Sequence, residues 1–106
     1  MDTSVYFKKS ELIPAVVQHY ETKEVLMVGF VSEEALKLTL SSGKAWFFSR
    51  SRNKLWMKGE TSGNVLKIVE IRSDCDDDTL LYVVSPAGPV CHTGNNSCFF
   101  KILKER

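Results

Sequence analysis

The sequence predicts a single α+β domain over residues 1–106, with mainly antiparallel, barrel-like strands and one principal helix. Short apolar segments bounded by turn residues recur along the chain, and only one stretch spaces its apolar residues as a helix does. Neighbouring strand-like segments are joined by brief polar turns, which favours hairpins. A chain of 106 residues buries a modest share of its surface without a metal or a partner subunit, so we expect it to assemble.

The first two expected strands form a hairpin. Residues 15–20 follow Pro14 and make an apolar segment that ends at a polar turn, residues 21–24. Residues 25–30 then form a second and more apolar segment, which we expect to be the more buried strand. Two strands separated by so short a turn are expected to pair with each other.

One helix is expected over residues 33–42. Ser32 is a good N-cap, and the acids Glu33 and Glu34 lie in the first turn, where the helix dipole favours negative charge. The apolar residues that follow keep helical spacing until Gly43, which is expected to end the helix.

The second half of the chain is strand-rich. Apolar and β-branched residues at strand spacing recur in four further segments, each bounded by polar or turn-forming residues. These segments are residues 45–48, 54–57, 65–72 and 79–84. The last of them closes at the turn-forming residues 85–89, and a final apolar stretch runs from Cys98 through Leu103.

Charge and composition narrow the class of partner. The net charge is +1 and 25% of the residues are charged, so the chain has no basic field suited to a nucleic-acid polymer, and a small ligand fits better. No apolar run approaches the ~20 residues that a membrane span needs, and no leader pattern begins the sequence. We therefore expect a cytoplasmic protein, whose reducing surroundings keep thiols free.

All three cysteines of the chain, and four of its aspartates, lie in two short segments, residues 74–78 and 91–98. Thiolates are soft ligands that select zinc, and clustered carboxylates are hard ligands that select magnesium or calcium. In an extended segment Asp74, Asp76 and Asp78 would point to one side and Cys75 to the other. Two different metal sites are therefore plausible.

The cysteine spacing favours a catalytic zinc site over a structural one. No C-x2-4-C knuckle is present, because fifteen residues separate Cys75 from Cys91 and six separate Cys91 from Cys98. Three thiolates leave a tetrahedral zinc ion one open position, which can hold water. The alternatives are inert buried cysteines and a solvated acidic turn; disulfides are disfavoured by the odd count.

Two other classes of protein remain open at this point. A structural zinc module would need a fourth protein ligand, for which His92 is the only nearby candidate. A thiol redox protein would be expected to carry a C-x-x-C pair, and the sequence has none.

A cluster of cations indicates local anion binding. Four basic residues, Arg50, Arg52, Lys54 and Lys58, fall within nine residues that hold no acid. The loop at residues 59–64 follows directly, and its glycines, hydroxyls and amides suit phosphate oxygens. The competing interpretation is a solvated hairpin end with an ordinary glycine-rich turn. Trp56 is the better candidate in this region for contact with an aromatic ring of a ligand, whereas its aromatic neighbours belong to the core.

Three segments together resemble a known family. Residues 56–64, 74–81 and 88–99 are closely similar to phosphoribosyl-AMP cyclohydrolases of histidine biosynthesis. The resemblance runs in order from about residue 25 to residue 100. It stops there, so the phosphoribosyl-ATP pyrophosphatase domain that some relatives carry downstream is expected to be absent and the chain to be monofunctional.

The resemblance implies a site and a reaction. Zinc ligands would be Cys75, Cys91 and Cys98, and magnesium ligands Asp74, Asp76 and Asp78, in an intertwined homodimer whose zinc site is shared between subunits. The expected hydrolysis opens the adenine ring of 1-(5-phosphoribosyl)-AMP between N1 and C6 and gives the formimino-AICAR ribotide. His92 is the candidate general base or proton shuttle, or else a hydrogen-bonding partner of a zinc ligand. The expected substrate-binding residues are Arg50, Arg52, Trp56, Lys58, Gly59, Glu60 and Ser62.

Overall fold

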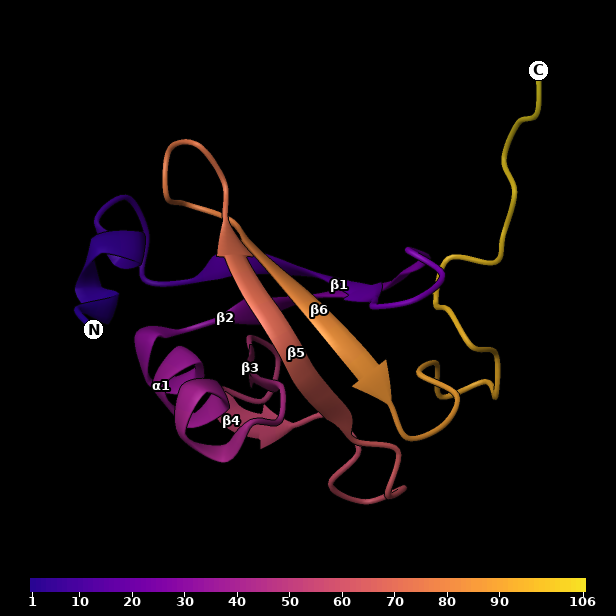
Figure 1. The fold of residues 1–106 in the computed structure, drawn as a ribbon, viewed down its shortest axis with the longest axis horizontal. Coiled ribbons are helices and arrows are strands. Elements are labelled where there is room, and N and C mark those ends of the chain that lie inside the picture. Colours follow the sequence, from indigo (N-terminus) through magenta and orange to yellow (C-terminus); the bar gives the residue numbers. More distant parts are fainter.

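The computed structural model describes residues 1–106 and contains six strands, one α-helix and one short 3-10 helix (Figure 1). Every expected strand and the expected helix are present, with ends that differ by at most two residues from those predicted. In chain order the elements are η1 (Thr3–Phe7), β1 (Ile13–His19), β2 (Val25–Val31), α1 (Glu33–Ser42), β3 (Trp46–Ser49), β4 (Lys54–Met57), β5 (Leu66–Ser73) and β6 (Leu80–Pro86).

The strands form two sheets, and this corrects one part of the prediction. β3 and β4 pair as a separate antiparallel hairpin, and the other strands form a sheet in the order β2-β1-β6-β5. Its outer strands do not meet, so the expected barrel-like closure is wrong. The α+β class is confirmed, but β1 and β6 run parallel, which makes the larger sheet mixed. β6 is buried along most of its length, and apolar strands of this kind take central places.

The helix begins and ends where capping chemistry predicts. The Ser32 side chain accepts a hydrogen bond from the Ala35 amide at 3.1 Å. Gly43 adopts the left-handed conformation, with φ of 73°, and donates to the Thr39 carbonyl at 3.0 Å. Ala35, Leu36 and Thr39 are the buried residues of α1, so this face of the helix closes the core.

The hairpin of β3 and β4 packs on the same side of the sheet as α1 (Figure 1). Phe47 is fully buried, and its ring lies 6.0 Å from the ring of Tyr82 and 5.3 Å from that of Trp56 between centroids. A Cβ atom added at Gly29 would lie 2.5 Å from the Phe47 ring. The glycine therefore lets the hairpin approach β2 closely.

The opposite face of the large sheet is less covered. Strand residues alternate between the two faces, and the side facing away from the helix carries Val16, Val28 and Leu81 in register. Val28 is 44% exposed, and Val16 and Leu81 are half-buried. An apolar strip of this kind on a sheet is open to a further layer.

The last part of the chain forms no helix or strand. From Phe99 onward the chain runs away from the body of the domain (Figure 1). The apolar stretch predicted there is exposed, with Phe99 at 63%, Ile102 at 71% and Leu103 at 97%. None of the helices has the length and apolar character needed to cross a bilayer.

Candidate functional site

The acidic window forms a tight turn between β5 and β6. The Asp74 carboxylate accepts hydrogen bonds from the amides of Asp78 at 3.0 Å and Thr79 at 3.2 Å, and Asp77 has a φ of 56°. The segment is thus not extended, and the alternating arrangement expected for it is wrong, because the aspartate side chain stabilises a turn instead. The turn still gathers Asp74, Asp76 and Asp78, whose carboxylates offer oxygens within 4.8 Å of one another.

A lysine from the N-terminal segment reaches this acidic triad. Lys9 Nζ lies 3.1 Å from an Asp76 oxygen and 3.2 Å from an Asp78 oxygen. Hydrogen bonding to Lys9 lowers the pKa of Asp76, and the two carboxylates raise the pKa of Lys9. A positive charge thus sits between two of the three carboxylates. This fits a triad that attracts cations, and hard oxygen donors of this kind suit magnesium.

Cys91 and Cys98 are held together by the loop that follows β6. The Cys91 amide donates to the Asn95 carbonyl at 3.1 Å, and the Gly94 amide donates back to the Cys91 carbonyl at 3.0 Å. The Cys98 amide donates to Leu26 of β2 at 2.8 Å, and the buried Ser97 hydroxyl donates to the Val25 carbonyl at 2.7 Å. The start of β2 therefore anchors one end of the loop.

The two thiols are close enough to affect each other, and both are unoxidised. The Thr93 hydroxyl donates to Cys91 Sγ at 3.1 Å and lowers the pKa of that thiol. Burial is the main cause that raises the pKa of Cys98, while the charge of Lys58 favours both thiolates. Metals bind thiolates rather than thiols, so a hydroxyl donor and a nearby lysine are suitable neighbours for a zinc-binding pair.

Cys75 lies far from this pair within one chain. It is exposed in the turn before β6, whereas Cys91 and Cys98 follow the other end of that strand. A seven-residue strand such as β6 spans about 20 Å at ~3.3 Å per residue. The acidic triad is the only group of three metal-ligating side chains that converges in the chain. A single subunit therefore brings together two of the three predicted zinc ligands.

The cation cluster divides between the two ends of the β3–β4 hairpin. Arg50 is exposed at the turn, with its guanidinium 3.9 Å from the centroid of the Phe30 ring, and Arg52 is also exposed there. Lys58 lies beyond the end of β4, on the side of the thiol pair, with Nζ 5.8 Å from the centroid of the Trp56 ring. The structure thus brings Lys58 to Cys91 and Cys98, and it leaves the two arginines at the far end of the hairpin.

The glycine-rich loop, residues 59–64, lies against the segment that leads to Cys91. The Asn64 side chain donates to the Pro89 carbonyl at 3.3 Å, and a Cβ added at Gly88 would lie 2.5 Å from the same side chain. Gly59 has a φ of 85°, and a Cβ there would meet the Asn64 backbone at 2.3 Å. Gly59 therefore closes the loop, while Glu60 and Ser62 are exposed on it.

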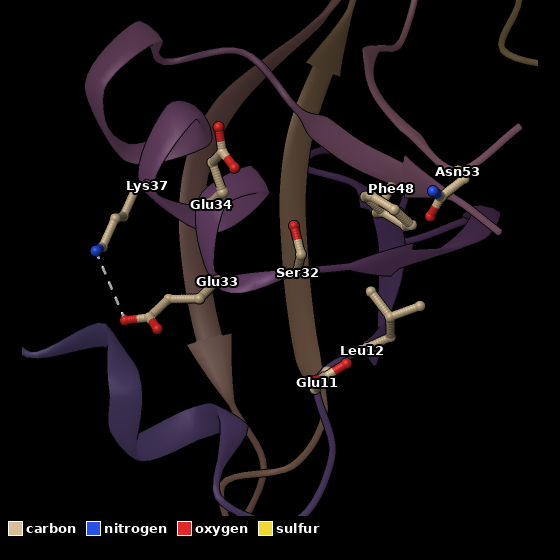
Figure 2. A pocket seen from close by; sticks show the side chains of 8 residues that line it. All are labelled: Glu11, Leu12, Ser32, Glu33, Glu34, Lys37, Phe48 and Asn53. Carbon is tan, nitrogen blue, oxygen red and sulfur yellow. Dashed lines mark ion pairs between the residues drawn. The ribbon is translucent and has the colours of Figure 1, made fainter.

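Several cavities lie near the arginine end of the hairpin, and two of them differ clearly in their lining. The first, about 370 Å³, is lined by Phe30, Phe48, Ser49, Ser51, Arg52 and Trp56. A larger one, about 750 Å³, lies beside the start of α1 (Figure 2). Three glutamates line it, and one of them, Glu33, pairs with Lys37 at 3.8 Å. An acidic wall repels phosphate, so the larger cavity is not a candidate for an anionic ligand.

Thr93 and Lys9 were not predicted, and the contact that Asn64 of the predicted loop makes with Pro89 was not predicted either. Thr93 lies two positions after Cys91, and a hydroxyl at this spacing could have been expected to contact the thiol. Lys9 and Asn64 meet the site only through the fold, because Lys9 is 67 residues from Asp76 and Asn64 is 25 residues from Pro89. His92 directly follows Cys91 in the chain, and its side chain is exposed.

Comparisons with known proteins identify relatives over nearly the whole chain. A family model described as phosphoribosyl-AMP cyclohydrolase matches residues 27–100. A phosphoribosyl-AMP cyclohydrolase of Archaeoglobus fulgidus is 58% identical over 92% of this chain and 91% of its own length. One of Geobacter sulfurreducens is 56% identical over 94% of this chain and 81% of its own length. A bifunctional histidine biosynthesis protein of Caldanaerobacter subterraneus is 57% identical over 93% of this chain. The match covers 48% of the length of that protein.

Proposed function

The chain belongs to the phosphoribosyl-AMP cyclohydrolase family of histidine biosynthesis, and we propose that it opens the adenine ring of 1-(5-phosphoribosyl)-AMP by hydrolysis between N1 and C6. The product is the formimino-AICAR ribotide. The observation that carries this proposal is the grouping of the Cys91 and Cys98 thiols with Lys58 and the 59–64 loop. Soft metal donors and groups suited to a phosphorylated nucleotide thus lie side by side, in the reducing cytoplasm where we place the enzyme.

The chemistry follows from the substrate. Alkylation at N1 makes the purine cationic and C6 electrophilic, so water adds at C6 and N1 departs. The exocyclic amine remains in the carboxamide that forms, which distinguishes the reaction from a deamination. We assign His92 the transfer of the proton from the attacking water to the departing nitrogen, since an imidazole can both accept and donate a proton through its ring nitrogens. Its exposure beside Cys91 supports this role.

Cys91 and Cys98 would hold zinc together with Cys75, and the fit rests on the soft thiol donors and on the Thr93 hydroxyl, which lowers the pKa of Cys91. When bound, zinc supplies a Lewis acid that lowers the pKa of water toward about 7. The substrate carries two phosphates, and Lys58, Arg50 and Arg52 are the cations that we assign to them. Trp56 would contact the base, and Gly59, Glu60 and Ser62 would border the ligand.

We infer a homodimer with a zinc site shared between subunits. The separation of Cys75 from Cys91 and Cys98 by the length of β6 supports this, because a second copy can supply the missing thiol. The uncovered strip at Val16 and Val28 offers apolar surface for such contact. Shared sites of this kind arise in isologous dimers, in which each subunit completes the site of the other.

The proposed reaction is tested by adding phosphoribosyl-AMP to the purified protein and following the ultraviolet absorbance change of the purine. We expect ring opening without release of ammonia, because the exocyclic nitrogen is retained. Mass spectrometry of the product should show the addition of one water molecule. Ammonia release, or no consumption of this substrate by zinc-loaded protein, would disprove the proposal.

A second experiment separates the two metals. Asp76→Asn should raise the magnesium concentration needed for half-maximal activation by at least about tenfold, since even losing a partner of a metal ligand costs about 10–100-fold in affinity. Zinc content, measured by elemental analysis, should stay unchanged. Asp77→Asn is the matched control, because Asp77 lies in the same turn, accepts from Ser73 and does not belong to the triad. A joint loss of zinc and magnesium responses would show that the two sites are not independent.

A further inference from the structure

We propose that the C-terminal tail, residues 99–103, adds as an antiparallel strand to the free edge of β5 in a second copy of the chain. The pairing would carry Cys98 of one subunit to Cys75 of the other. This inference deepens the proposed function, since it rests on a shared zinc site and names the contact that assembles it.

The tail has the properties of an unpaired strand. Its apolar side chains are exposed, with Phe100 at 44% and Ile102 at 71%. Beyond Phe99 no backbone amide or carbonyl makes a hydrogen bond within the chain. The tail also projects away from the domain (Figure 1). A segment with exposed apolar side chains and free backbone groups is suited to adding a strand to a sheet edge.

Of the two edges of the sheet, the second half of β5 is the free edge that leads directly to the turn with Cys75. The sheet order places β2 and β5 at its edges. β2 already receives the Cys98 amide at Leu26. The start of β5 is covered by the segment after α1, because Ala45 donates to Leu66 and Ile68 donates to Gly43. Residues 69–73 stay uncovered, and Val69 is 54% exposed. Such an edge is a template for another strand.

Direction and register both favour an antiparallel pairing. β5 ends two residues before Cys75, and the tail begins one residue after Cys98. An antiparallel pair therefore sets the beginning of the tail against the end of β5, next to Cys75. A parallel pair would set Cys98 beside the start of β5, about one strand length away from Cys75. Only the antiparallel direction gathers the three thiols.

One register also matches the side chains. With Lys101 opposite Glu70, Phe100 lies opposite Ile71, and both pairs precede the β-bulge that β5 has at Val69. Opposite charges and apolar pairs that face each other across two strands stabilise the pairing. Cys98 then lies opposite Ser73. Within a single subunit Glu70 is paired with Arg72, and both side chains are largely exposed, so Glu70 is accessible to a second chain.

The first test replaces an anchor of the tail. Phe100→Asp should weaken dimerisation at least tenfold in sedimentation equilibrium and lower the zinc content per chain. Tyr20→Asp is the matched control, because Tyr20 is another exposed aromatic residue, 39% against 44%, and lies in the turn between β1 and β2. The control should leave both measurements unchanged. Circular dichroism should show the same secondary structure in both variants, since Phe100 is outside every helix and strand.

The register is tested by reversing the charge pair. Lys101→Glu and Glu70→Lys should each weaken the dimer, and the double variant should recover most of the loss, because the pair is restored with opposite sign. Arg106→Glu changes a tail cation that lies beyond the free edge, and it should have little effect. Recovery in the double variant also shows that the single variants were folded.

The outcomes separate this inference from the proposed function. If the tail variants dimerise and hold zinc like the wild type, the tail contact is wrong, and ring opening by the wild type still supports the function. If the wild type does not open the ring while the tail variants dissociate into monomers, the proposed function is wrong and the tail contact is supported. Weakening by Tyr20→Asp equal to that by Phe100→Asp would also overturn the tail contact.

Discussion

Mixing inactive Cys75→Ala and Cys98→Ala subunits in equal amounts is expected to restore about a quarter of the wild-type activity, because random exchange makes about half of the dimers heterodimers and one of the two shared sites in each heterodimer is intact. Each variant homodimer lacks a zinc ligand at both sites, so both should be inactive. In the heterodimer one site collects both changes and the other collects neither. The separation of Cys75 from the Cys91–Cys98 pair by the length of β6 is the structural reason for this expectation.

The matched control for this experiment mixes Cys91→Ala with Cys98→Ala. The loop after β6 holds these two cysteines together in one subunit. Every site in that heterodimer therefore still lacks one thiol, and no activity should return. Subunit exchange is verified by native mass spectrometry. A confirmed Cys75/Cys98 heterodimer that stays as inactive as its parents would show that one chain forms the zinc site alone.

Local chemistry made most of the elements predictable from sequence. Ser32 and Gly43 define the helix through hydrogen bonds to nearby backbone, so their effect can be recognised without knowing the fold. The strands between turn residues were recognisable for the same reason. The parallel neighbours β1 and β6 were not, since their pairing joins residues more than sixty positions apart. Long-range pairing of this kind depends on how the whole chain packs.

At the candidate site, too, features set by neighbouring residues were predictable and long-range contacts were not. The acidic triad was predicted and converges, although the reason given for it was wrong: a turn, not an extended strand, gathers the carboxylates. Lys9 was not predicted, because no local pattern connects it to Asp76 and Asp78. The resemblance to a family supplied the cysteine ligands, and the spacing of residues alone did not reveal that Cys75 lies at the opposite end of β6.

Removal of zinc should abolish ring opening and also weaken the dimer. We expect one zinc per chain by elemental analysis, loss of turnover with a strong chelator, and recovery when zinc is added back. Full activity in a sample verified to be free of zinc would contradict this. Thr93→Val should weaken zinc binding only in part, because it keeps all three thiols and removes only the hydrogen bond by which Thr93 lowers the pKa of Cys91. Without that hydrogen bond the pKa rises, less thiolate is present near neutral pH, and less chelator should suffice.

The effect of zinc on the dimer follows from linkage. If two subunits must meet to form each site, dimerisation raises zinc affinity by some factor, and zinc must raise the dimerisation constant by the same factor per site. Sedimentation equilibrium with and without chelator measures that factor directly. Cys75→Ala should reduce it, since Cys75 is the ligand that crosses between subunits in the proposed site. A dimerisation constant that zinc does not change would mean that the metal binds within one chain, whatever its role in the reaction.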